Sequence, residues 1–422
     1  MAEITLLPRK LSGTITVPPS KSLAHRMIIC AALADGESRI SPIQGSEDIL
    51  ATLDGMRALG AECRLEGDTA IICGAGARRQ TAPVEICCRE SGSTLRFLVP
   101  LSMTLGVGAH FTGAPGLAVR PLTPYRTICE SVGAEYSHQA LPELSAHVRG
   151  SLPAGRYEVP GNISSQFITG LLLALSVTGG DSEIVLTTPL ESTAYVDLTL
   201  DAMASFGVNV NITPNGYFIP GGQTYTARDA IVEGDYSQAA NWLCAAALGS
   251  DIAVAGLNPD SFQGDRDILD VLRAMGAEIG YSGGAFRVQA DHLRAVDVDV
   301  SNIPDIAPVI ALTCCFAEGT SRIRNAGRLR IKECDRLSAT VQAINAMGGC
   351  AEERAEEMII TGTGSLRGGN ICACRNDHRM AMLHAVASTR CEQPLTLDSR
   401  ECVRKSYPHF WNDFAAVGGK FQ

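Results

Sequence analysis

Six glycines recur along this chain, each directly after a hydrophobic residue that ends a segment with helical periodicity. Successive glycines are separated by 73, 74, 69, 72 and 70 residues. The six pairs are Leu59-Gly60, Val132-Gly133, Phe206-Gly207, Met275-Gly276, Met347-Gly348 and Val417-Gly418. A glycine just past a helix supplies the left-handed residue that ends it. A near-constant period over 422 residues therefore predicts one supersecondary unit present in six copies.

Each copy also contains another helical segment, which comes before the glycine-ended one along the chain. This earlier segment is more apolar and begins at a polar residue. The predicted starts are Ser22, Ser93, Ser164, Ser237, Asp305 and His378. Ser and Asp are favoured at the N-cap of a helix, and Ser22 is the predicted cap of the first. A helix that is apolar nearly all round, such as 167–177, must be buried on every side. Each unit is thus predicted to read strand–helix–strand–helix–strand–strand, with the first helix inside and the second outside.

This pattern predicts an α/β fold of two domains, an inside-out α/β barrel in which each domain holds three βαβαββ repeats. A chain of 422 residues is too long for one ordinary core. We place the first lobe at residues 20–228 and the second at 1–19 plus 229–422. The alternating apolar residues of 1–19 are expected to add a strand to the second lobe, which would make that lobe discontinuous. Inner helices pointing at the inter-domain cleft would gather their N-termini there, and helix N-termini bind anions.

Composition excludes several classes of protein. A net charge of −10 argues against a nucleic-acid binder. The 15 cysteines are scattered or adjacent within apolar runs, which favours reduced thiols in a cytoplasmic protein over disulfides. No Cys or His pairs stand at zinc spacing, so no metal site is expected. The first residues lack the basic and apolar regions of a secretory signal, and no apolar run is long enough to predict a membrane span.

Cationic and small polar residues stand at the predicted helix starts of the first three repeats. Lys21 and Arg26 flank the start after Pro18-Pro19, where a positive charge is unfavourable to the helix dipole unless an anion compensates. Segment 90–96 brings a Ser-Gly-Ser turn with Gly92 and an arginine, Arg96, in the first turn. Glycine permits close approach of the backbone to a ligand. The third repeat offers Ser164, Ser165 and Gln166, more donors than capping alone requires.

The later repeats add carboxylates to the cations. Asp305 stands at a helix start, where, taken alone, an ordinary N-cap is the better interpretation. Lys332, Glu333 and Arg336 crowd another start, and Arg379 a third. Arg120 and Lys405 are each predicted to begin an outer helix. Arginine favours bidentate contact with carboxylate or phosphate, so both lobes are expected to bind a multiply charged anion.

In their order along the chain, these motifs resemble the 5-enolpyruvylshikimate-3-phosphate synthase family over essentially the whole sequence. The segments that carry the resemblance are P-P-S-K-S-L-A-H-R (18–26), R-P-L (120–122), S-S-Q-F (164–167), P-D-I (304–306), K-E-C-D-R-L (332–337) and D-H-R-M-A-M (377–382). The fold of that family, two lobes of three βαβαββ units, agrees with the period. The resemblance implies transfer of the enolpyruvyl group of phosphoenolpyruvate to the 5-hydroxyl of shikimate 3-phosphate, through a tetrahedral intermediate, in aromatic amino-acid biosynthesis. It implies no metal and no organic cofactor.

The resemblance also assigns roles to residues. Shikimate 3-phosphate would be bound by Lys21, Ser22, Arg26, Ser164, Ser165, Gln166, Ser192, Tyr195, Asp305 and Lys332. Phosphoenolpyruvate would be bound by Lys21, Gly92, Arg96, Arg120, Gln166, Arg336, Arg379 and Lys405. Asp305 would accept the 5-hydroxyl proton and Glu333 would handle the proton at C3, with the division of acid and base roles among these two and Lys21 left open. We expect a cytoplasmic monomer that acts on these small molecules, with no nucleic-acid or membrane partner.

Two positions depart from the family pattern. Glu90 stands where many members have Asn, and Arg328 where others have Asn near the shikimate phosphate. Gly92 keeps room for the inhibitor glyphosate, so sensitivity to it is expected.

Three rival functions are open to this sequence. The sister enzyme that acts on UDP-N-acetylglucosamine typically has a Lys-Asn pair and a loop cysteine, whereas this chain has Lys21-Ser22 and no cysteine in 113–119. A non-catalytic anion-binding protein would not need both Asp305 and Glu333. An RNA-end-processing enzyme of related fold is disfavoured by the net charge and the motifs.

Overall fold

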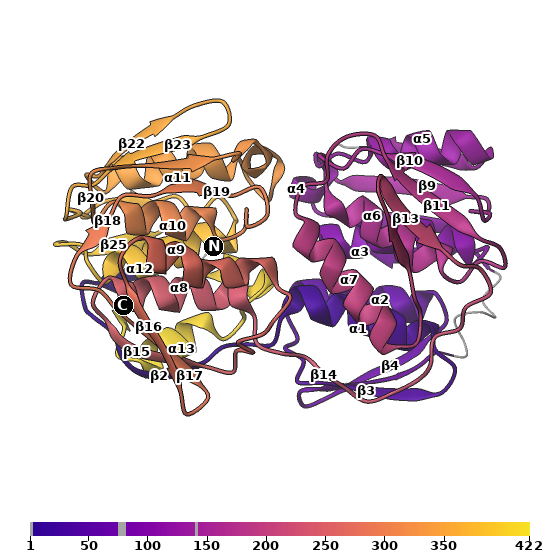
Figure 1. Ribbon diagram of the computed structural model, residues 1–422, viewed down its shortest axis with the longest axis horizontal. Coiled ribbons are helices and arrows are strands. Elements are labelled where there is room, and N and C mark those ends of the chain that lie inside the picture. The colour runs from indigo at the N-terminus through magenta and orange to yellow at the C-terminus, as the bar shows by residue number, and fades with distance from the viewer. Residues whose placement is uncertain (1–2, 75–81, 140–141) are drawn as a thin grey trace. The chain divides into compact units, whose positions relative to one another are not determined.

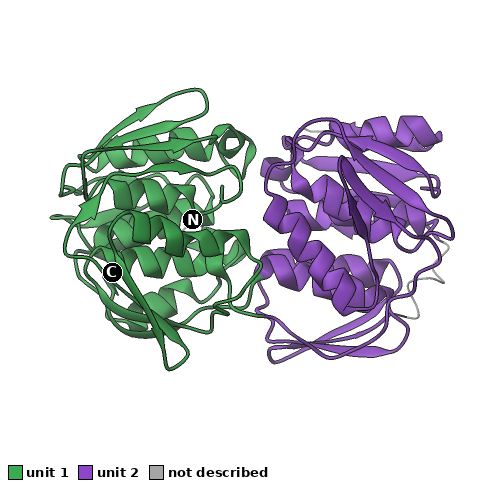
Figure 2. Cartoon of the chain, viewed as in Figure 1, with its two compact units in different colours: residues 1–20, 233–422 green, residues 21–232 purple. Residues whose placement is uncertain are grey.

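The computed structural model describes residues 3–74, 82–139 and 142–422 of the chain. These residues form two compact units, one of residues 21–232 and one of residues 1–20 with 233–422 (Figure 2). Below, unit 1 is the discontinuous one and unit 2 is residues 21–232. The sequence prediction placed the boundaries after residues 19 and 228, and the division falls after Ser20 and Val232.

The six periodic glycines end six helices, as the sequence predicts. These outer helices are α2 (Glu47–Ala58), α5 (Thr123–Val132), α7 (Thr193–Ser205), α9 (Ile268–Ala274), α11 (Arg336–Ala346) and α13 (Phe410–Ala416). Each glycine has a φ between 69° and 102°. The residue after each glycine donates its N–H to the carbonyl group five residues earlier, at 2.8–3.0 Å. This left-handed cap satisfies carbonyl groups that a helix end leaves unpaired.

Six inner helices form the centres of the two units, surrounded by sheets and the outer helices (Figure 1). They are α1 (Lys21–Leu33), α3 (Gly92–Thr104), α6 (Ser165–Leu175), α8 (Tyr236–Ala247), α10 (Ala307–Cys314) and α12 (His378–Ser388). Every residue of α8, α10 and α12 is buried. Burial on all sides explains why these helices carry no polar stripe.

Several predicted helix starts and caps are wrong by one or two residues. Ser91, not Ser93, caps α3, because its side chain accepts from the N–H of Thr94. Asp235, not Ser237, caps α8 in the same way. Helix α1 begins one residue before Ser22, and Asp305 lies two residues before the first residue of α10, with Ile306 at the N-cap. Ser164 and His378 are correct, as the N-cap of α6 and the first residue of α12.

The two outer-helix starts predicted from cations are also wrong. Arg120 lies between a short helix, α4 (Pro115–Ala118), and α5. Lys405 ends a 3₁₀ helix, η4 (Glu401–Lys405), and α13 starts only at Phe410. Neither residue therefore begins an outer helix: Arg120 lies in a connection and Lys405 is the last residue of η4.

Each repeat contributes one four-stranded sheet with the same pairing pattern. The first two strands are parallel and the remaining pairs are antiparallel. In unit 2 the sheets are β14-β3-β5-β4 (Ala230–Ile231, Glu37–Ser41, Thr69–Cys73, Glu62–Glu66), β6-β7-β9-β8 (Val84–Cys87, Ala109–Gly113, Leu144–Arg149, Glu135–Gln139) and β10-β11-β13-β12 (Arg156–Val159, Ser182–Leu186, Gly216–Ile219, Asn211–Thr213). A parallel pair requires a crossover, and in the second and third of these sheets the inner helix, α3 or α6, supplies it.

Unit 1 repeats the pattern with strands from both parts of the chain. Its sheets are β2-β15-β17-β16 (Ser12–Thr16, Asp251–Ala255, Ala285–Gln289, Glu278–Ser282), β19-β21-β23-β22 (Asp297–Asp299, Thr320–Arg324, Met358–Thr361, Cys350–Glu353) and β24-β25-β1-β26 (Ile371–Cys372, Leu395–Leu397, Ile4–Leu7, Lys420–Phe421). A short parallel pair, β18 (Leu293–Arg294) and β20 (Ala317–Glu318), stands apart. The N-terminal segment therefore supplies two strands, β1 and β2, where the sequence predicts one.

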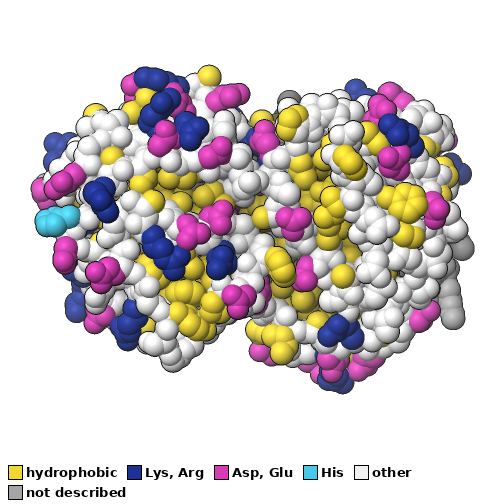
Figure 3. All heavy atoms as spheres, in the orientation of Figure 1, with side chains coloured by type: hydrophobic (Ala, Val, Ile, Leu, Met, Phe, Trp, Pro, Cys, Tyr) yellow, Lys and Arg dark blue, Asp and Glu magenta, His cyan; other side chains and the backbone are white. Residues whose placement is uncertain are grey.

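Each unit has its own hydrophobic core, built mainly from aliphatic residues of the inner helices and the inner faces of the sheets. Aromatic side chains cluster in unit 1, where Trp242 of α8 packs against Phe410 with ring centroids 5.3 Å apart. Over the part of the chain that is described, none of the helices combines the length and apolar character needed to cross a membrane. On the face drawn in Figure 3, basic and acidic side chains are interspersed over both units.

Candidate active site

The N-terminal halves of α1, α3, α6 and α7 and the residues just before them carry the predicted ligands of unit 2, except Arg120, which lies between α4 and α5. Lys21, the first residue of α1, forms an ion pair with Asp48 of α2, with Nζ 2.7 Å from Oδ2. Their side chains are only 18% and 11% exposed. Burial, with the charges of Lys21 and Arg26, lowers the pKa of neighbouring His25 well below its ordinary value. His25 is therefore neutral at physiological pH, and it contacts Thr52 through Nδ1 at 2.7 Å.

Arg26 joins α1 to α7 through its guanidinium group, which is almost fully buried. Nε donates to Thr199 Oγ1 at 2.7 Å, Nη1 to the Ser22 carbonyl at 2.6 Å and Nη2 to the Tyr195 carbonyl at 2.8 Å. Burial lowers the pKa of Arg26 to about 10, so the group stays charged at neutral pH. All three acceptors are uncharged, so these bonds leave the positive charge available to an anion.

Arg96 and Gln166 join the second and third repeats. Arg96 Nη1 donates to Gln166 Oε1 at 2.7 Å, and Gln166 Nε2 donates to Ser93 Oγ at 3.0 Å. The Arg96 guanidinium also lies over the ring of Phe167, 5.1 Å from its centroid. Helices α3 and α6 therefore bring one cation and one amide from separate motifs to the same place.

Gly92 is the first residue of α3, and it lies against the side chain of Arg120. A Cβ built at Gly92 would come within 2.6 Å of Arg120 Nη1. The absence of a side chain at Gly92 therefore lets the Arg120 guanidinium lie across the start of the helix. The two residues stand 28 positions apart in sequence and belong to motifs that were interpreted separately.

The serines predicted in unit 2 occupy helix starts. Ser164 caps α6 and Ser165 is its first residue. Ser192, just before α7, has φ 57° and ψ 45°, a left-handed conformation that is uncommon for serine. Its carbonyl accepts from the N–H of Tyr195 at 3.1 Å. Strained backbone of this kind clusters at ligand sites.

In unit 1, Asp305 lies among three cations. Its Oδ1 is 2.9 Å from Arg336 Nη1 and 3.2 Å from Lys332 Nζ, and its Oδ2 is 3.9 Å from Arg379 Nη2. Burial lowers the pKa of Lys332, as do the charges of Arg328 and Arg336, while Asp305 opposes the shift. Arg328, in η3 (Gly327–Ile331), therefore adds positive charge beside Lys332.

Arg336 is the most densely paired residue of the site. Besides Asp305, its side chain contacts Glu333 at 2.7 Å and Asp377 at 2.7 and 3.1 Å through two nitrogens. Burial by itself would lower the pKa of Arg336, but Asp377, Glu333 and Asp305 outweigh it and hold the pKa well above its ordinary value. One guanidinium thus fixes carboxylates from three different segments.

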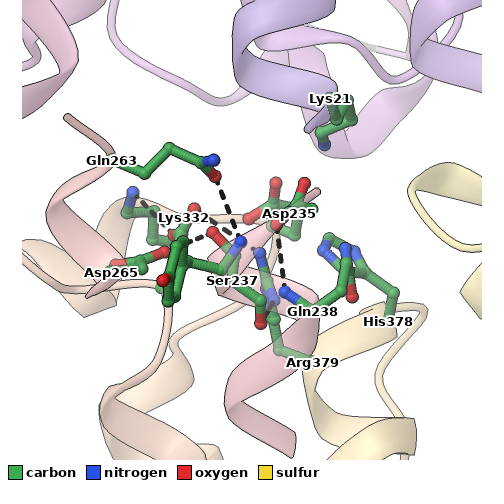
Figure 4. Close-up of polar contacts among 12 residues, drawn as sticks. Lys21, Asp235, Ser237, Gln238, Gln263, Asp265, Lys332, His378 and Arg379 are labelled. Carbon is green, nitrogen blue, oxygen red and sulfur yellow. Dashed lines mark hydrogen bonds and ion pairs between the residues drawn. The ribbon is translucent and has the colours of Figure 1, made fainter. Parts of the chain in front are cut away.

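Arg379 and Lys405 are both held by backbone carbonyl groups. Arg379, in the first turn of α12, donates through Nη1 to the Ser237 carbonyl of α8 at 2.6 Å (Figure 4). Lys405 donates through Nζ to the Asn376 carbonyl at 2.6 Å. Both side chains are buried, so the start of α12 has two cations packed about it.

Sequence reasoning missed the acidic partners of Arg336 and Lys21. Asp377 is fully buried, caps α12 and is the bidentate partner of Arg336. Asp48 pairs with Lys21. Asp377 directly precedes a predicted helix start, a position typical of an N-cap. The local sequence could therefore have predicted that Asp377 caps the helix, but not that it pairs with Arg336. Glu90 is half-buried in the turn before α3, and its effect on ligand binding stays a prediction.

Comparison with known proteins shows the family to which the chain belongs. The model of the family described as EPSP synthase (3-phosphoshikimate 1-carboxyvinyltransferase) matches residues 7–414. A 3-phosphoshikimate 1-carboxyvinyltransferase of Clostridium perfringens is 44% identical over 421 residues, which cover 99% of both chains. The protein of that name from Clostridioides difficile is 43% identical over 430 residues, covering 100% of this chain and 98% of its own.

Solved structures show the same fold. EPSP synthase from Acinetobacter baumannii superposes with a TM-score of 0.81 at 24% identity, with 100% of both chains covered. The enolpyruvyl transferase NikO from Streptomyces tendae gives 0.79 at 17% identity, covering 100% of this chain and 98% of its own. The match of a family model and of curated relatives over nearly the whole length shows that this chain belongs to the EPSP synthase family.

Proposed function

We propose that this protein transfers the enolpyruvyl group of phosphoenolpyruvate to the 5-hydroxyl of shikimate 3-phosphate and releases phosphate. The family match and the names of full-length relatives support this reaction over the UDP-N-acetylglucosamine alternative. Asp305, a carboxylate held among Lys332, Arg336 and Arg379, carries the proposal. A carboxylate is a group that can accept a proton, and the cations beside it suit an anionic substrate.

In this proposal unit 2 provides most of the groups that bind shikimate 3-phosphate. They are Lys21, Ser22, Arg26, Ser164, Ser165, Gln166, Ser192 and Tyr195, with Asp305 and Lys332 from unit 1. The helix N-termini of α1 and α6 and the uncompensated charge of Arg26 suit a phosphate. A phosphate charge about 4 Å from one guanidinium gains roughly 4 kcal/mol at an effective dielectric near 20, before desolvation is subtracted.

In the same proposal, phosphoenolpyruvate is bound by cations of both units together with Gly92 and Gln166. The set is Lys21, Gly92, Arg96, Arg120, Gln166, Arg336, Arg379 and Lys405. The contact of Arg120 with Gly92 and the Arg96–Gln166 hydrogen bond support the unit 2 part. The clustering of Arg336 and Arg379 around Asp305 supports the unit 1 part.

The chemical steps are addition followed by elimination. Asp305 accepts the proton of the 5-hydroxyl group as the hydroxyl oxygen attacks C2 of phosphoenolpyruvate. Glu333 delivers a proton to C3. The C3 proton then returns to Glu333 while phosphate is expelled with the proton that Asp305 had accepted, and the double bond is restored. Lys21 assists by holding charge on the phosphate that leaves. The close contact of Asp305 and Glu333 with the same Arg336 supports their pairing as acid and base.

We further infer that the protein acts in the cytoplasm as a monomer, with no cofactor and no nucleic-acid or membrane partner. All 15 cysteines lie in the described part of the chain as free thiols, most of them buried. This favours a reducing compartment.

Phosphate release tests the reaction directly. We expect release when both substrates are present and none with either substrate alone. Release from phosphoenolpyruvate without shikimate 3-phosphate would overturn the proposal. The same assay, with glyphosate in large excess over phosphoenolpyruvate, is expected to show strong inhibition.

Two substitutions test the assigned chemistry. Asp305→Ala and Lys21→Met should each reduce turnover at least about a thousandfold, because they remove a proton acceptor or a charge that acts in the transition state. Asp251→Ala and Lys10→Met, at exposed positions, are matched controls that should keep normal turnover. Normal turnover in either site variant would remove that residue from the mechanism.

A further inference from the structure

Asp265 is a buried carboxyl group that the proposed mechanism does not use. It lies in a 3₁₀ helix, η2 (Gly264–Asp267), and is 2% exposed. Its Oδ2 accepts a hydrogen bond from the hydroxyl of Ser237, in the first turn of α8. Removing a carboxyl group from water is costly, so a buried one requires a specific reason for its presence.

The hydrogen bond from Ser237 leads directly to a proposed substrate ligand. The carbonyl oxygen of Ser237 accepts from Arg379 Nη1 at 2.6 Å. Asp265, Ser237 and Arg379 therefore form a continuous chain of contacts from η2 through α8 to α12 (Figure 4). The second end nitrogen of the same guanidinium lies 3.9 Å from Asp305.

The segment that carries Asp265 also forms hydrogen bonds with the start of α8 through a second residue, Gln263. Gln263 accepts from the N–H of Tyr236 at 3.1 Å and donates to the Gly234 carbonyl at 2.8 Å. The N–H of Gln238 is already bound by the N-cap, Asp235, at 3.0 Å. Gln263 and Asp235 already cap the N-terminal end of α8. The hydrogen bond from Ser237 to Asp265 therefore serves a purpose other than capping this helix.

We propose that Asp265 is a positioning residue for phosphoenolpyruvate binding, because it fixes Ser237, whose carbonyl group orients the guanidinium of Arg379. This assignment rests on the proposed function, in which Arg379 binds phosphoenolpyruvate. Asp265 touches no substrate in this scheme. It holds the first turn of α8 in the one position from which the carbonyl group of Ser237 meets Arg379.

The charges that surround Asp265 agree with this role. Burial, followed by the charges of Asp305 and Asp235, raises the pKa of Asp265 to about 7, while the bond from Ser237 and the charge of Arg379 oppose the rise. The acidic groups that face Asp265 come from the N-cap of α8 and the segment before α10, and the cation comes from α12. A carboxyl group in this setting is linked electrostatically to both Arg379 and the proposed base.

Steady-state kinetics of three variants test the assignment. Asp265→Ala and Ser237→Ala should each raise the KM for phosphoenolpyruvate about tenfold, the effect of one hydrogen bond to a charged group, while the KM for shikimate 3-phosphate changes less than about twofold. Asp265→Asn keeps an acceptor for the Ser237 hydroxyl and should restore most of the loss. Asp270→Ala, an exposed acid of α9, is the matched control and should behave as wild type.

The outcomes separate this inference from the proposed function. If the wild type is active and both Ser237→Ala and Asp265→Ala keep its KM for phosphoenolpyruvate, the positioning role is overturned. An equal rise in the KM for both substrates, without rescue by Asp265→Asn, would also overturn it, because that pattern means general damage. Should Asp265→Ala not fold, the Ser237→Ala and Asp265→Asn pair decides by the same criteria. A wild type without turnover on both substrates would instead overturn the proposed function, and this assignment with it.

Discussion

Arg26 and Arg96 of unit 2 are held in a different way from Arg336 of unit 1. In unit 2, Arg26 donates to hydroxyl and carbonyl oxygens, and Arg96 donates to an amide and a carbonyl oxygen, all of them uncharged. In unit 1, Arg336 is surrounded by Asp305, Glu333 and Asp377. Arg26 thus keeps positive charge for an anion to neutralise, whereas Arg336 holds carboxylates. The difference suits binding in the first case and proton transfer in the second.

Removing Arg336 should have the largest effect. Arg336→Met leaves fully buried Asp377 without its bidentate partner, and we expect the free energy of unfolding to fall by about 3–5 kcal/mol. Urea denaturation measures this loss. Arg330→Met is the matched control, because Arg330 is 29% exposed in its ion pairs with Asp335 and Glu353 and should lose about 1 kcal/mol or less. Equal losses in the two variants would contradict the comparison.

The stability of the protein should depend on pH through Asp265, a buried acid of unit 1. The pKa of Asp265 is about 7 in the folded protein against an ordinary value of 3.8. Between these pH values the folded state binds a proton that the unfolded state does not, so this group destabilises the fold increasingly as pH rises through that window.

Asp265→Asn removes that penalty. From pH 4 to pH 8, the stability of the variant relative to wild type should therefore rise, by up to about 4 kcal/mol. Denaturation midpoints across this range, with Asp270→Asn as control, provide the measurement. A relative stability that is independent of pH would show that Asp265 keeps an ordinary pKa.

Arg26→Met should sharpen the contrast from the side of unit 2. The variant loses hydrogen bonds to neutral acceptors but also a buried charge, so we expect a fall in unfolding free energy of only about 1–2 kcal/mol. The KM for shikimate 3-phosphate should nevertheless rise more than about tenfold. Destabilisation as large as that of Arg336→Met, with little change in KM, would show that Arg26 is structural.

The smallest expected effect on stability is that of Gly92→Ala. The new methyl group would stand 2.6 Å from Arg120 Nη1 and displace the end of a flexible side chain, so the unfolding free energy should change by less than about 0.5 kcal/mol. Displacing Arg120 should raise the KM for phosphoenolpyruvate about tenfold. Gly116→Ala, where no atom lies within 4 Å of the added carbon, should leave both quantities unchanged. A tenfold rise there too would remove the steric explanation.

The sequence allowed the helices to be predicted better than their first residues. Gly60 and its five counterparts ended outer helices as predicted, because a left-handed cap is a local requirement. The starts at Ser93 and Ser237 were wrong, since each stands two residues after another capping residue, Ser91 or Asp235. Both members of each pair are acceptable caps, so local pattern cannot choose between them.

The sequence by itself determined the sixfold repetition, the apolar inner helices and the cations near their starts, because period, hydrophobicity and residue type are local properties. Only the tertiary structure decided which acids those cations and helix starts meet. Lys21 meets Asp48 from 27 residues away, Ser237 meets Asp265 from 28, and Arg336 meets Asp377 from 41. The first two pairings join the inner helix of a repeat to a later segment of the same repeat, and the third joins the fifth repeat to the sixth. All three follow from tertiary packing, and a carboxylate at a helix start has the same local sequence whichever partner it finds.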